Sequence, residues 1–276
     1  NRLGDLSAAM IALLPAALLF AIFNIYPILY SGYLSLMAWD GLSPDRVFVG
    51  LSNYAAIFNS LQFANSLRVT FVYALGVTVF GVGIALVIAV MINTVITGRT
   101  LYRMLYFIPV VTSTIAVAVV WRLLMAPGTG YADIFLRGVG ITPPSPSWLR
   151  NPDWALYIVI LIGVWKRLGF NLVIYMAGLQ GIPTEYYDAA RVDGAGALAQ
   201  FRYITLPLIA PITLLLVIMS VIDSFLIFDI VYVLTDGGPL GSTEVIGLLL
   251  YRMAFRYFDL GTASAIGWVI FGIIFT

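Results

Sequence analysis

The sequence predicts an all-α membrane protein with six visible transmembrane helices, and three observations support this fold class. First, 62% of the 276 residues are hydrophobic and 10% are charged, and a mean hydropathy of +1.01 lies outside the range of soluble globular chains. Second, six apolar runs reach the length of about 20 residues that a helix needs to cross a bilayer. Third, residues 77–92, "VTVFGVGIALVIAVMI", lack the alternation of membrane β-strands.

A helix satisfies every backbone polar group within its own segment, which makes it the expected element for each run in lipid. In chain order the runs are approximately 8–37, 69–94, 104–125, 155–179, 208–235 and 260–276. The chain starts with Asn1 and stops at Thr276 inside an apolar run, so we expect both natural ends to be missing. We predict a single transmembrane domain over 1–276.

The loops between the runs contain their own signals. Residues 38–68 hold the turn "DGLSP" and then "LSNYAAIF", which we expect to form an interfacial helix. Residues 126–154 hold "PGTG" and "TPPSPSW", where glycine and proline exclude one continuous helix. Six spans place these loops and 236–259 on one side of the membrane. The N-terminus, the 95–103 connection and a polar insert at 180–207 then lie on the other side.

The residue types that are absent limit the chemistry. The chain has no cysteine and no histidine, so it lacks thiol nucleophiles, thiolate ligands and the commonest general base. A net charge of +1 gives no basic stripe for nucleic-acid phosphates. We therefore expect no catalytic residue, no metal site and no nucleic-acid partner.

The polar insert reads as two short helices joined at glycine. Pro183 suits a first helical turn, with Thr184 as a cap and Glu185 near the positive end of the dipole, so a helix is expected at about 184–192. Gly194 and Gly196 permit a bend with positive φ. A second short helix follows through "ALAQFRYI", and Pro207 marks the turn into the next run.

The insert also offers a surface that a protein partner can approach. Ala189 and Ala190 add little bulk, and Asp188 and Arg191 can form charge-assisted bonds. "EYYDAARVDGAG" followed by "ITLP" resembles the cytoplasmic signature of ABC importer permeases, which reads Glu-Ala-Ala, a later glycine, then Ile-x-Leu-Pro. The matching positions are Asp188, Ala189, Ala190, Gly194, Ile204, Leu206 and Pro207, with Asp188 departing from the usual Glu.

This resemblance extends along nearly the whole chain. "LLPAALLFAIFNIYP" and "FVGLSNY" are similar to the first helix and following loop of these permeases. "VWKRLGFNLVIYMAGLQGIP", "FDIVYVLTDGGPLGSTE" and "YRMAFRYFDLGTASAI" are similar to the carbohydrate-uptake branch of the family. The resemblance implies the type I ABC importer permease fold, with 183–207 as a cytoplasmic coupling segment in a groove of an ATPase. It implies ATPase-coupling roles for Glu185, Asp188, Ala189, Ala190, Arg191 and Gly194.

The resemblance also implies the partners and the location. We expect a second, non-identical permease, two ATP-binding subunits, an extracytoplasmic solute-binding protein, and a multi-pass position in a bacterial or archaeal cytoplasmic membrane. The chain has no G-x-x-x-x-G-K-[ST] motif, so ATP and Mg are expected in the partner ATPase and no cofactor in this chain. The positive-inside rule opposes this orientation, because more Arg residues fall on the expected outer side.

Four charged residues lie deep in the apolar runs. Lys166 and Arg167 lie about 12 residues into the fourth run, and Asp223 and Asp229 lie comparably deep in the fifth. A charge at the centre of a membrane helix costs about 3 kcal/mol or more, so these side chains must face a cavity or each other. Either they pair and hold the two helices together, or some of them line a solute path.

Helical spacing selects candidates for that path. Ser220, Asp223, Ser224 and Ile227 follow an i, i+3, i+4, i+7 pattern, and Arg167, Asn171 and Tyr175 recur every four residues. The resemblance implies that the solute is contacted from Lys166, Arg167 and Phe170 on one helix and from Ser220, Asp223, Ser224 and Ile227 on another. Aromatic rings can stack on sugars. The full candidate set is Lys166, Arg167, Phe170, Asn171, Tyr175, Ser220, Asp223, Ser224, Ile227 and Phe228.

The favoured function is therefore a non-catalytic subunit that forms half of an ATP-driven import path for a sugar-like solute. If Lys166 and Arg167 are not neutralised, glycerol phosphate, a glycerophosphodiester or an anionic sugar is the alternative cargo. An alternative from another class is an ion-coupled secondary transporter with Asp223 and Asp229 as ion sites. An intramembrane hydrolase would lack both histidine and cysteine.

Overall fold

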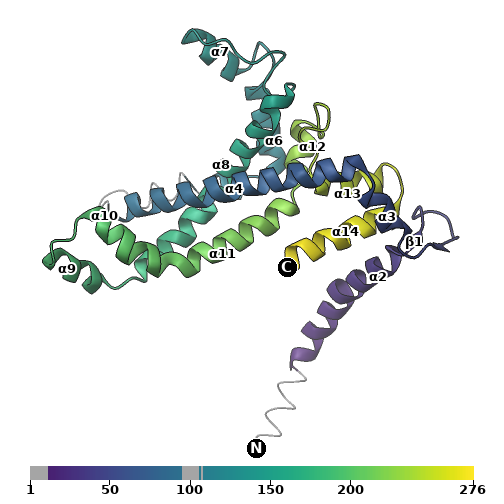
Figure 1. The fold of residues 1–276 in the computed structure, drawn as a ribbon, viewed down its shortest axis with the longest axis horizontal. Coiled ribbons are helices and arrows are strands. Elements are labelled where there is room, and N and C mark those ends of the chain that lie inside the picture. Colours follow the sequence, from purple (N-terminus) through teal and green to yellow (C-terminus); the bar gives the residue numbers. More distant parts are fainter. Residues whose placement is uncertain (1–11, 95–105, 107) are drawn as a thin grey trace, which may run out of the picture. The chain divides into compact units, whose positions relative to one another are not determined.

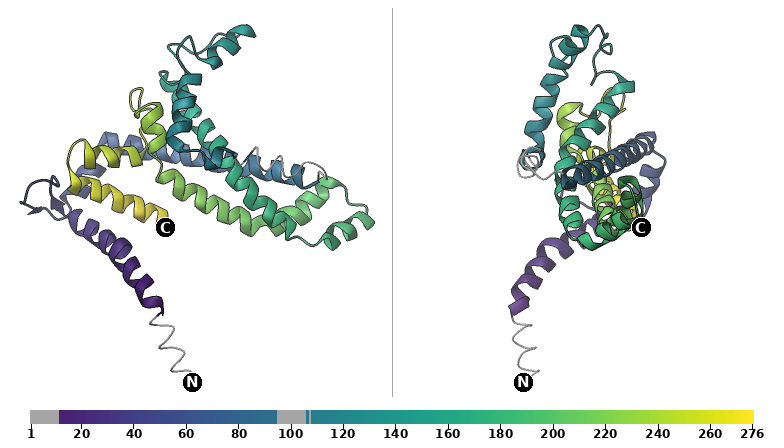
Figure 2. Two further views of the ribbon diagram at one scale, coloured as in Figure 1. Left: turned by 180° about the vertical axis from the view of Figure 1, so that it is seen from behind. Right: turned by 90° about the vertical axis from the view of Figure 1, so that its left-hand side faces the viewer.

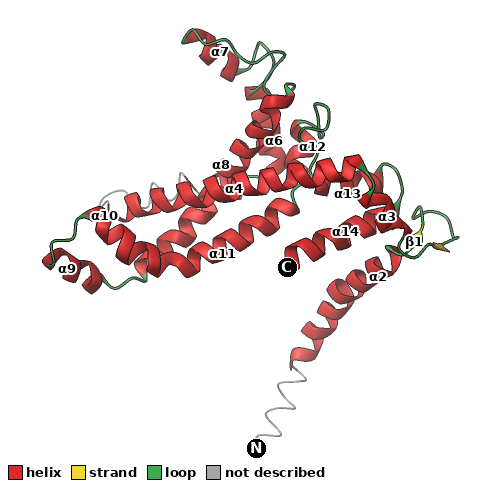
Figure 3. Ribbon diagram, in the orientation of Figure 1, coloured by secondary structure: helices red, strands yellow, loops and turns green. Residues whose placement is uncertain are grey.

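The computed structural model describes residues 12–94, 106 and 108–276, and helices dominate this part of the chain (Figures 1 and 3). Its elements are η1 (Ala21–Ile25), α2 (Tyr26–Leu34), β1 (Met37–Ala38), β2 (Val47–Phe48), α3 (Ser52–Phe58), α4 (Leu61–Thr94), α6 (Thr114–Leu124), α7 (Tyr131–Gly138), α8 (Pro152–Gln180), α9 (Thr184–Val192), α10 (Ala197–Gln200), η2 (Phe201–Thr205), α11 (Leu206–Phe225), α12 (Asp229–Leu234), α13 (Ile246–Phe255) and α14 (Leu260–Phe275). The chain divides into two compact units, 1–63 with 249–276, and 64–248.

The first unit packs the C-terminal helix α14 against α2 and α3. The indole Nε1 of Trp268 donates a hydrogen bond to Ser31 Oγ at 3.2 Å. A Cβ atom on Gly32 would lie 2.9 Å from the Trp268 ring, closer than side-chain atoms tolerate. Glycine at position 32 therefore allows the indole to lie flat against α2.

A short loop structure joins these helices in the first unit. Strands β1 and β2 pair antiparallel, with Met37 opposite Phe48. Helix α3 confirms the helix expected at "LSNYAAIF". Its Asn53 Nδ2 donates to the carbonyl oxygens of Ser35 and Met37, at 2.9 Å each. One amide side chain thus fastens α3 to the end of α2.

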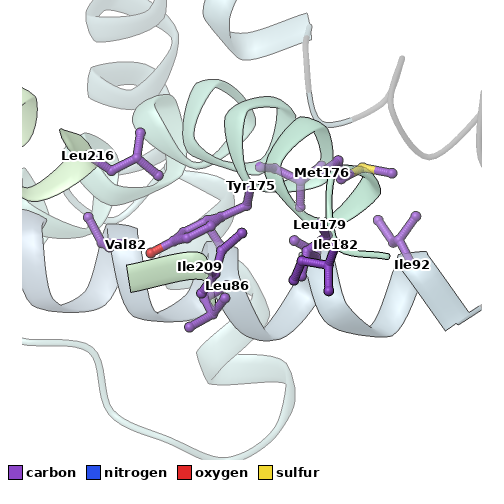
Figure 4. Close-up of a cluster of buried hydrophobic side chains, with 12 residues drawn as sticks. Val82, Leu86, Ile92, Tyr175, Met176, Leu179, Ile182, Ile209 and Leu216 are labelled. Carbon is purple, nitrogen blue, oxygen red and sulfur yellow. The ribbon is translucent and has the colours of Figure 1, made fainter. Parts of the chain in front are cut away.

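The second unit is built on three long helices, α4, α8 and α11, which run side by side (Figures 1 and 2). Figure 4 shows the apolar cluster between them, in which buried side chains from all three helices pack together. The cluster consists of Val82, Ala85, Leu86, Ala89, Ile92, Leu172, Tyr175, Met176, Leu179, Ile182, Ile209 and Leu216. Transfer of a large aliphatic side chain from water into such a cluster stabilises a protein by roughly 1.5–3 kcal/mol. Between helices in lipid, the stabilisation comes instead from close van der Waals packing.

Four helices of the described chain are long and apolar enough to cross a membrane: Ala12–Leu34, Leu61–Asn93, Pro152–Gln180 and Ala197–Phe225. They coincide with the first, second, fourth and fifth predicted runs. The third run lies partly outside the described residues, and its described part forms the shorter helix α6. The sixth run forms the shorter helix α14. A total of six spans therefore stays a prediction.

The fifth run is not one continuous helix, which corrects the prediction for 208–235. Helix α11 ends at Phe225, residues 226–228 are non-helical, and α12 starts at Asp229. The Ile227 carbonyl turns toward α13, where a Cβ on Gly247 would lie 2.5 Å from its oxygen. Packing against a bare glycine backbone thus favours the break, which hydropathy alone does not reveal.

The second short helix expected in the polar insert is also corrected. α10, η2 and α11 form one helical run, Ala197–Phe225, and Pro207 lies inside it. η2 is a π-helical turn in which the Leu206 N–H donates to the Phe201 carbonyl. Proline lacks an N–H and its ring clashes with the carbonyl four residues earlier, so a widened turn accommodates it. η1 precedes Pro27 in the same way, with Tyr26 N–H bonded to Ala21.

Candidate functional site

A cavity of 490 Å³ lies in the second unit, beside the middle of α8 and the end of α11. Its walls are formed by α4, the residues around the start of α6, α8, the end of α11 and the non-helical 226–228 with the start of α12. The lining residues are Tyr73, Val77, Val110, Thr114, Gly163, Lys166, Arg167, Phe170, Met219, Asp223, Ser224, Leu226, Ile227, Asp229 and Ile230. Six of the predicted solute-path residues are among them: Lys166, Arg167, Phe170, Asp223, Ser224 and Ile227.

The central polar contact of the cavity joins α8 to α11. The Arg167 guanidinium forms an ion pair with the Asp223 carboxylate. The arginine side chain is 14% exposed and the aspartate side chain 57%, so the carboxylate is the more accessible partner. The guanidinium also lies 5.9 Å from the centre of the Phe170 ring, within cation–π range. One of the two pairings expected between these helices is therefore present.

Lys166 has different partners. Its Nζ donates to the carbonyl oxygens of Thr112 at 3.0 Å and Pro109 at 3.4 Å. These carbonyls lie at the C-terminal end of the helical residues 108–111, where the backbone dipole favours a cation. Asp229 accepts a hydrogen bond from the Ile230 N–H at 2.8 Å, at the start of α12. Lys166 and Arg167 are adjacent in sequence but contact different parts of the structure, the residues before α6 and the end of α11.

Tyr73 of α4 was not among the sequence candidates, and it forms part of the cavity wall. Its hydroxyl approaches α8 at Gly163, where a Cβ would meet the Val77 side chain at 3.0 Å and overlap the Tyr73 hydroxyl. The sequence analysis did not select this residue, because the second run contains no charged residue that would mark a cavity-facing stripe. Gly163 in the fourth run, which leaves room for a large side chain from a neighbouring helix, was the sequence feature that could have indicated Tyr73.

Three predicted path residues lie in buried contacts between helices, outside the cavity lining. Asn171 Nδ2 donates to the Gly81 carbonyl at 3.1 Å, and the Tyr175 hydroxyl donates to Thr213 Oγ1 at 3.1 Å. Ser220 Oγ accepts from Thr78 Oγ1 at 3.0 Å. Phe228 also lies outside the lining; its ring packs near Tyr232 with centroids 6.3 Å apart. A solute-path role for these four stays a prediction.

Ile227 lines the cavity, as predicted, but it does so from a non-helical segment and not from a helix. The i, i+7 spacing from Ser220 assumed a helix through Ile227, whereas α11 ends two residues earlier. The break brings the non-helical Leu226 and Ile227 and the start of α12 to the cavity together. Asp229, which an unbroken helix would place on another face, therefore lines the same cavity.

The polar insert forms the exposed helix α9, with no buried residue. Pro183 occupies the N-cap position without a side-chain cap bond, so the predicted cap by Thr184 is absent. Asp188 and Arg191 form an ion pair at 2.6 Å on this helix, with side chains 62% and 65% exposed. Such an exposed pair contributes about 0.3–0.5 kcal/mol, so either partner is available to another protein at little cost.

Gly194 ends α9 in a Schellman motif. Its φ is +80°, its N–H donates to the Arg191 carbonyl at 3.1 Å, and the Ala195 N–H reaches back to the Ala190 carbonyl at 2.8 Å. Gly194 thus confirms the predicted bend with positive φ. Gly196 does not, because its φ is −71° in extended backbone. Tyr187 ties α9 to η2, with its hydroxyl 3.0 Å from Thr205 Oγ1.

Among the described residues, no group of three or more Asp, Glu, His or Cys side chains could hold a metal ion. The polar atoms of the cavity instead form a mixed set of carboxylates, one ammonium, one guanidinium and hydroxyls. Such a set can exchange hydrogen bonds with a polar solute and has no nucleophile and base in contact.

Comparison with known proteins gives consistent matches. The family model described as "Binding-protein-dependent transport system inner membrane component" matches residues 81–276. The trehalose/maltose transport system permease protein MalF of Thermococcus litoralis is 35% identical over 90% of this chain and 82% of its own. The sn-glycerol-3-phosphate transport system permease protein UgpA of Yersinia enterocolitica is 30% identical over 91% and 85%.

A solved structure shares the fold as well. It is the bacterial alginate ABC transporter in complex with an alginate pentasaccharide-bound periplasmic protein, and its matching chain superposes with a TM-score of 0.83 at 25% identity, over 99% of this chain and 93% of the other. The apolar spans, the exposed helix α9 with its glycine bend, and these matches lead to one conclusion. The chain belongs to the family of binding-protein-dependent transport system inner membrane components, the permease subunits of ABC importers.

Proposed function

We propose that this chain forms half of the membrane path of an importer for a sugar or sugar-like solute, and that the cavity between α8 and α11 is its part of that path. The observation that supports this most directly is a 490 Å³ cavity with charged and aromatic lining beside two helices long enough to cross a membrane. Charged groups at such depth are costly unless they serve a cavity. The name of the Thermococcus litoralis relative supports a sugar as cargo.

Within this proposal the candidate residues divide into two groups. Lys166, Arg167, Phe170, Asp223, Ser224 and Ile227 line the cavity and contact the solute. Asn171, Tyr175 and Ser220 set the spacing of α4, α8 and α11 through their buried hydrogen bonds. Phe170 offers an aromatic face for a sugar ring, as the cation–π contact leaves part of the ring exposed to the cavity.

The coupling segment 183–207 is proposed to dock on an ATP-hydrolysing subunit. Glu185, Asp188, Ala189 and Arg191 are exposed on α9, Ala190 is half-buried, and Gly194 sets the bend. Exposed apolar side chains accompany them, with Val192 at 88% and Leu198 at 80% exposure. A charged helix with uncovered apolar neighbours fits a protein groove better than it fits open water.

The remaining partners follow from the same proposal. Two ATP-binding subunits would hold ATP and Mg, and a second, non-identical permease would complete the path within a single permease domain per chain. A solute-binding protein would deliver the cargo from outside, by analogy with the bacterial alginate ABC transporter and its pentasaccharide-bound periplasmic protein. An ion-coupled mechanism has no support from the relatives, which are named as permeases of transport systems of this family.

The test is solute-stimulated ATP hydrolysis by the reconstituted complex with its binding protein and a panel of saccharides. Asp188→Lys should abolish the stimulation, because it reverses the charge at the docking surface while the complex still assembles. Asp45→Lys, an equal charge reversal in the exposed loop before β2, should leave it intact. Full stimulation in the Asp188→Lys complex would disprove the coupling role, and transport by the purified chain alone would establish the ion-coupled alternative.

A further inference from the structure

The charges that line the cavity cancel each other. Lys166 and Arg167 contribute two positive charges, and Asp223 and Asp229 contribute two negative charges. Relatives of this chain are named for neutral and for anionic solutes, trehalose and maltose in one case and glycerol 3-phosphate in another. The names therefore leave the charge of the cargo open, and the geometry of the four charged groups has to decide it.

Both cations already have partners within the protein. The Arg167 side chain is 14% exposed and its guanidinium is paired with Asp223. Its Nε and Nη2 atoms are buried and have no hydrogen-bond partner among the described residues. Lys166 is occupied by the carbonyl oxygens of Pro109 and Thr112. An anion that bound the guanidinium would compete with the Asp223 carboxylate, which already neutralises it.

Asp223 is also the more exposed member of the pair, at 57% of its side chain. An anionic solute that approached Arg167 would therefore also meet the more exposed Asp223 carboxylate, and repulsion between like charges is strong in a partly desolvated site. An uncharged saccharide meets no such barrier. Its hydroxyls can donate to the carboxylates of Asp223 and Asp229, and its ring can stack on Phe170.

We propose that Asp223, through its ion pair with Arg167, makes this cavity selective for uncharged saccharides against uronates and sugar phosphates. The inference rests on the proposed function, because it assumes that the solute passes through this cavity. It adds the residue that sets the charge of the cargo. Arg167 alone would favour an anion, and the pair removes that preference.

The absence of cysteine from the chain allows a direct measurement of cavity charge. Ile227→Cys would place the only thiol of this chain in the lining, and the same complex without this substitution gives the background from its partner subunits. The rates of its modification by an anionic and a cationic methanethiosulfonate give a ratio that reports the local potential. Asp223→Asn should raise the anion-to-cation ratio by about tenfold, since one charge disappears at close range. Asp153→Asn, the same change at the exposed start of α8, should leave it unchanged.

Two further variants complete the test. Arg167→Gln should lower the ratio, and the double variant Arg167→Gln with Asp223→Asn should return it close to the parent value. If the complex with Asp223→Asn does not assemble, the ratio measured with Arg167→Gln still tests whether the ion pair sets the charge of the cavity. If the anion-to-cation ratios of Asp223→Asn and Arg167→Gln both equal the ratio of Asp153→Asn, Asp223 does not control the charge of the cavity and the inference is wrong.

Protection by solute separates this inference from the proposed function. Neutral saccharides, with trehalose, maltotriose and raffinose as probes, should slow modification of the Ile227→Cys complex, and trigalacturonate or glucose 6-phosphate should slow it only in the Asp223→Asn background. Protection by anionic probes in the parent would overturn the selectivity and leave the path assignment standing. If none of the probes protects, the cavity is not the solute path, whatever the charge ratios show.

Discussion

At the scale of single residues, neighbours in sequence have different tasks. Lys166 and Arg167 are adjacent, but successive side chains on a helix point about 100° apart. Arg167 therefore reaches Asp223 on α11, and Lys166 reaches the carbonyl oxygens at 109 and 112. A pair of cations that looks like one anion site in the sequence is divided between two contacts in the structure.

Gly169, a glycine of α8 that packs against Tyr106, provides a prediction about packing. A Cβ on Gly169 would overlap the Tyr106 carbonyl oxygen, a backbone atom that cannot rotate away. Gly169→Ala should therefore cost about 1–3 kcal/mol through overpacking. Gly83→Ala on α4 meets nothing within 4 Å and should be neutral or stabilising by up to about 1 kcal/mol. Thermal denaturation of the purified complex compares the two, and equal melting temperatures would contradict the prediction.

Asp40 provides a prediction about pH. The N–H groups of Ser43 and Leu42 and the Ser43 hydroxyl donate to its carboxylate, and they lower the pKa of Asp40 below its ordinary value of 3.8. A depressed pKa means that these bonds stabilise the loop at neutral pH and are lost as pH falls through the lowered value.

Hydrogen exchange at the Leu42 and Ser43 amides should therefore stay protected from pH 7 down to the ordinary Asp value of 3.8 and lose protection only at lower pH, after correction for intrinsic rates. In Asp40→Asn the amide oxygen can still accept these bonds and does not titrate. Its protection should be independent of pH. A pH profile shared by both proteins would refute the role of the carboxylate.

At the scale of elements, the ends of helices carry the functional geometry. The stop of α11 at Phe225 brings Ile227 and Asp229 to the cavity, and the stop of α9 at Gly194 shapes the coupling segment. In both places a glycine is required, at 247 for the close approach of a carbonyl and at 194 for positive φ. The interiors of these helices supply apolar packing.

Gly194 and Gly196 form a matched pair for an element-scale prediction. A Cβ on either would meet nothing within 4 Å, but only Gly194 has positive φ. Gly194→Ala should strain the end of α9 by about 1 kcal/mol and reduce solute-stimulated ATP hydrolysis by roughly fivefold, if docking requires the bend. Gly196→Ala should retain the parent rate. Equal rates would show that the bend is not needed for coupling.

At the scale of the whole molecule, the expected orientation in the membrane rests on the resemblance of the coupling segment 183–207 to that of ABC importer permeases, and the distribution of charge opposes it. The expected cytoplasmic side holds fewer arginines than the expected outer side, namely Arg2, Arg99, Arg103, Arg191 and Arg202 against Arg46, Arg68, Arg122, Arg137, Arg150, Arg252 and Arg256. Helix α4 begins earlier than the sequence suggested and includes Arg68 in its first turns. The remaining excess still opposes the positive-inside rule.

Single thiols can decide the orientation, because the chain has no cysteine of its own. Leu198→Cys, at a position 80% exposed in the coupling segment, should react with an impermeant thiol reagent only from the cytoplasmic face once peripheral subunits are removed. Leu240→Cys, at a position 96% exposed in the 236–245 loop, should react only from the opposite face. Labelling of both positions from one face would mean that an even number of spans lies between residues 198 and 240, which would contradict a single span there.

The helical membrane class, the four long spans, α9 with its glycine bend, and six residues of the cavity lining could all be predicted from the amino-acid sequence. Hydropathy, period and local backbone preference are encoded within short windows, so a single chain reveals them. The tertiary structure alone decided which cation pairs with Asp223, where α11 stops, that Tyr73 and Asp229 join the cavity, and that Asn171, Tyr175 and Ser220 are buried between helices. Those outcomes depend on contacts between residues tens of positions apart, which close packing selects and no local pattern records.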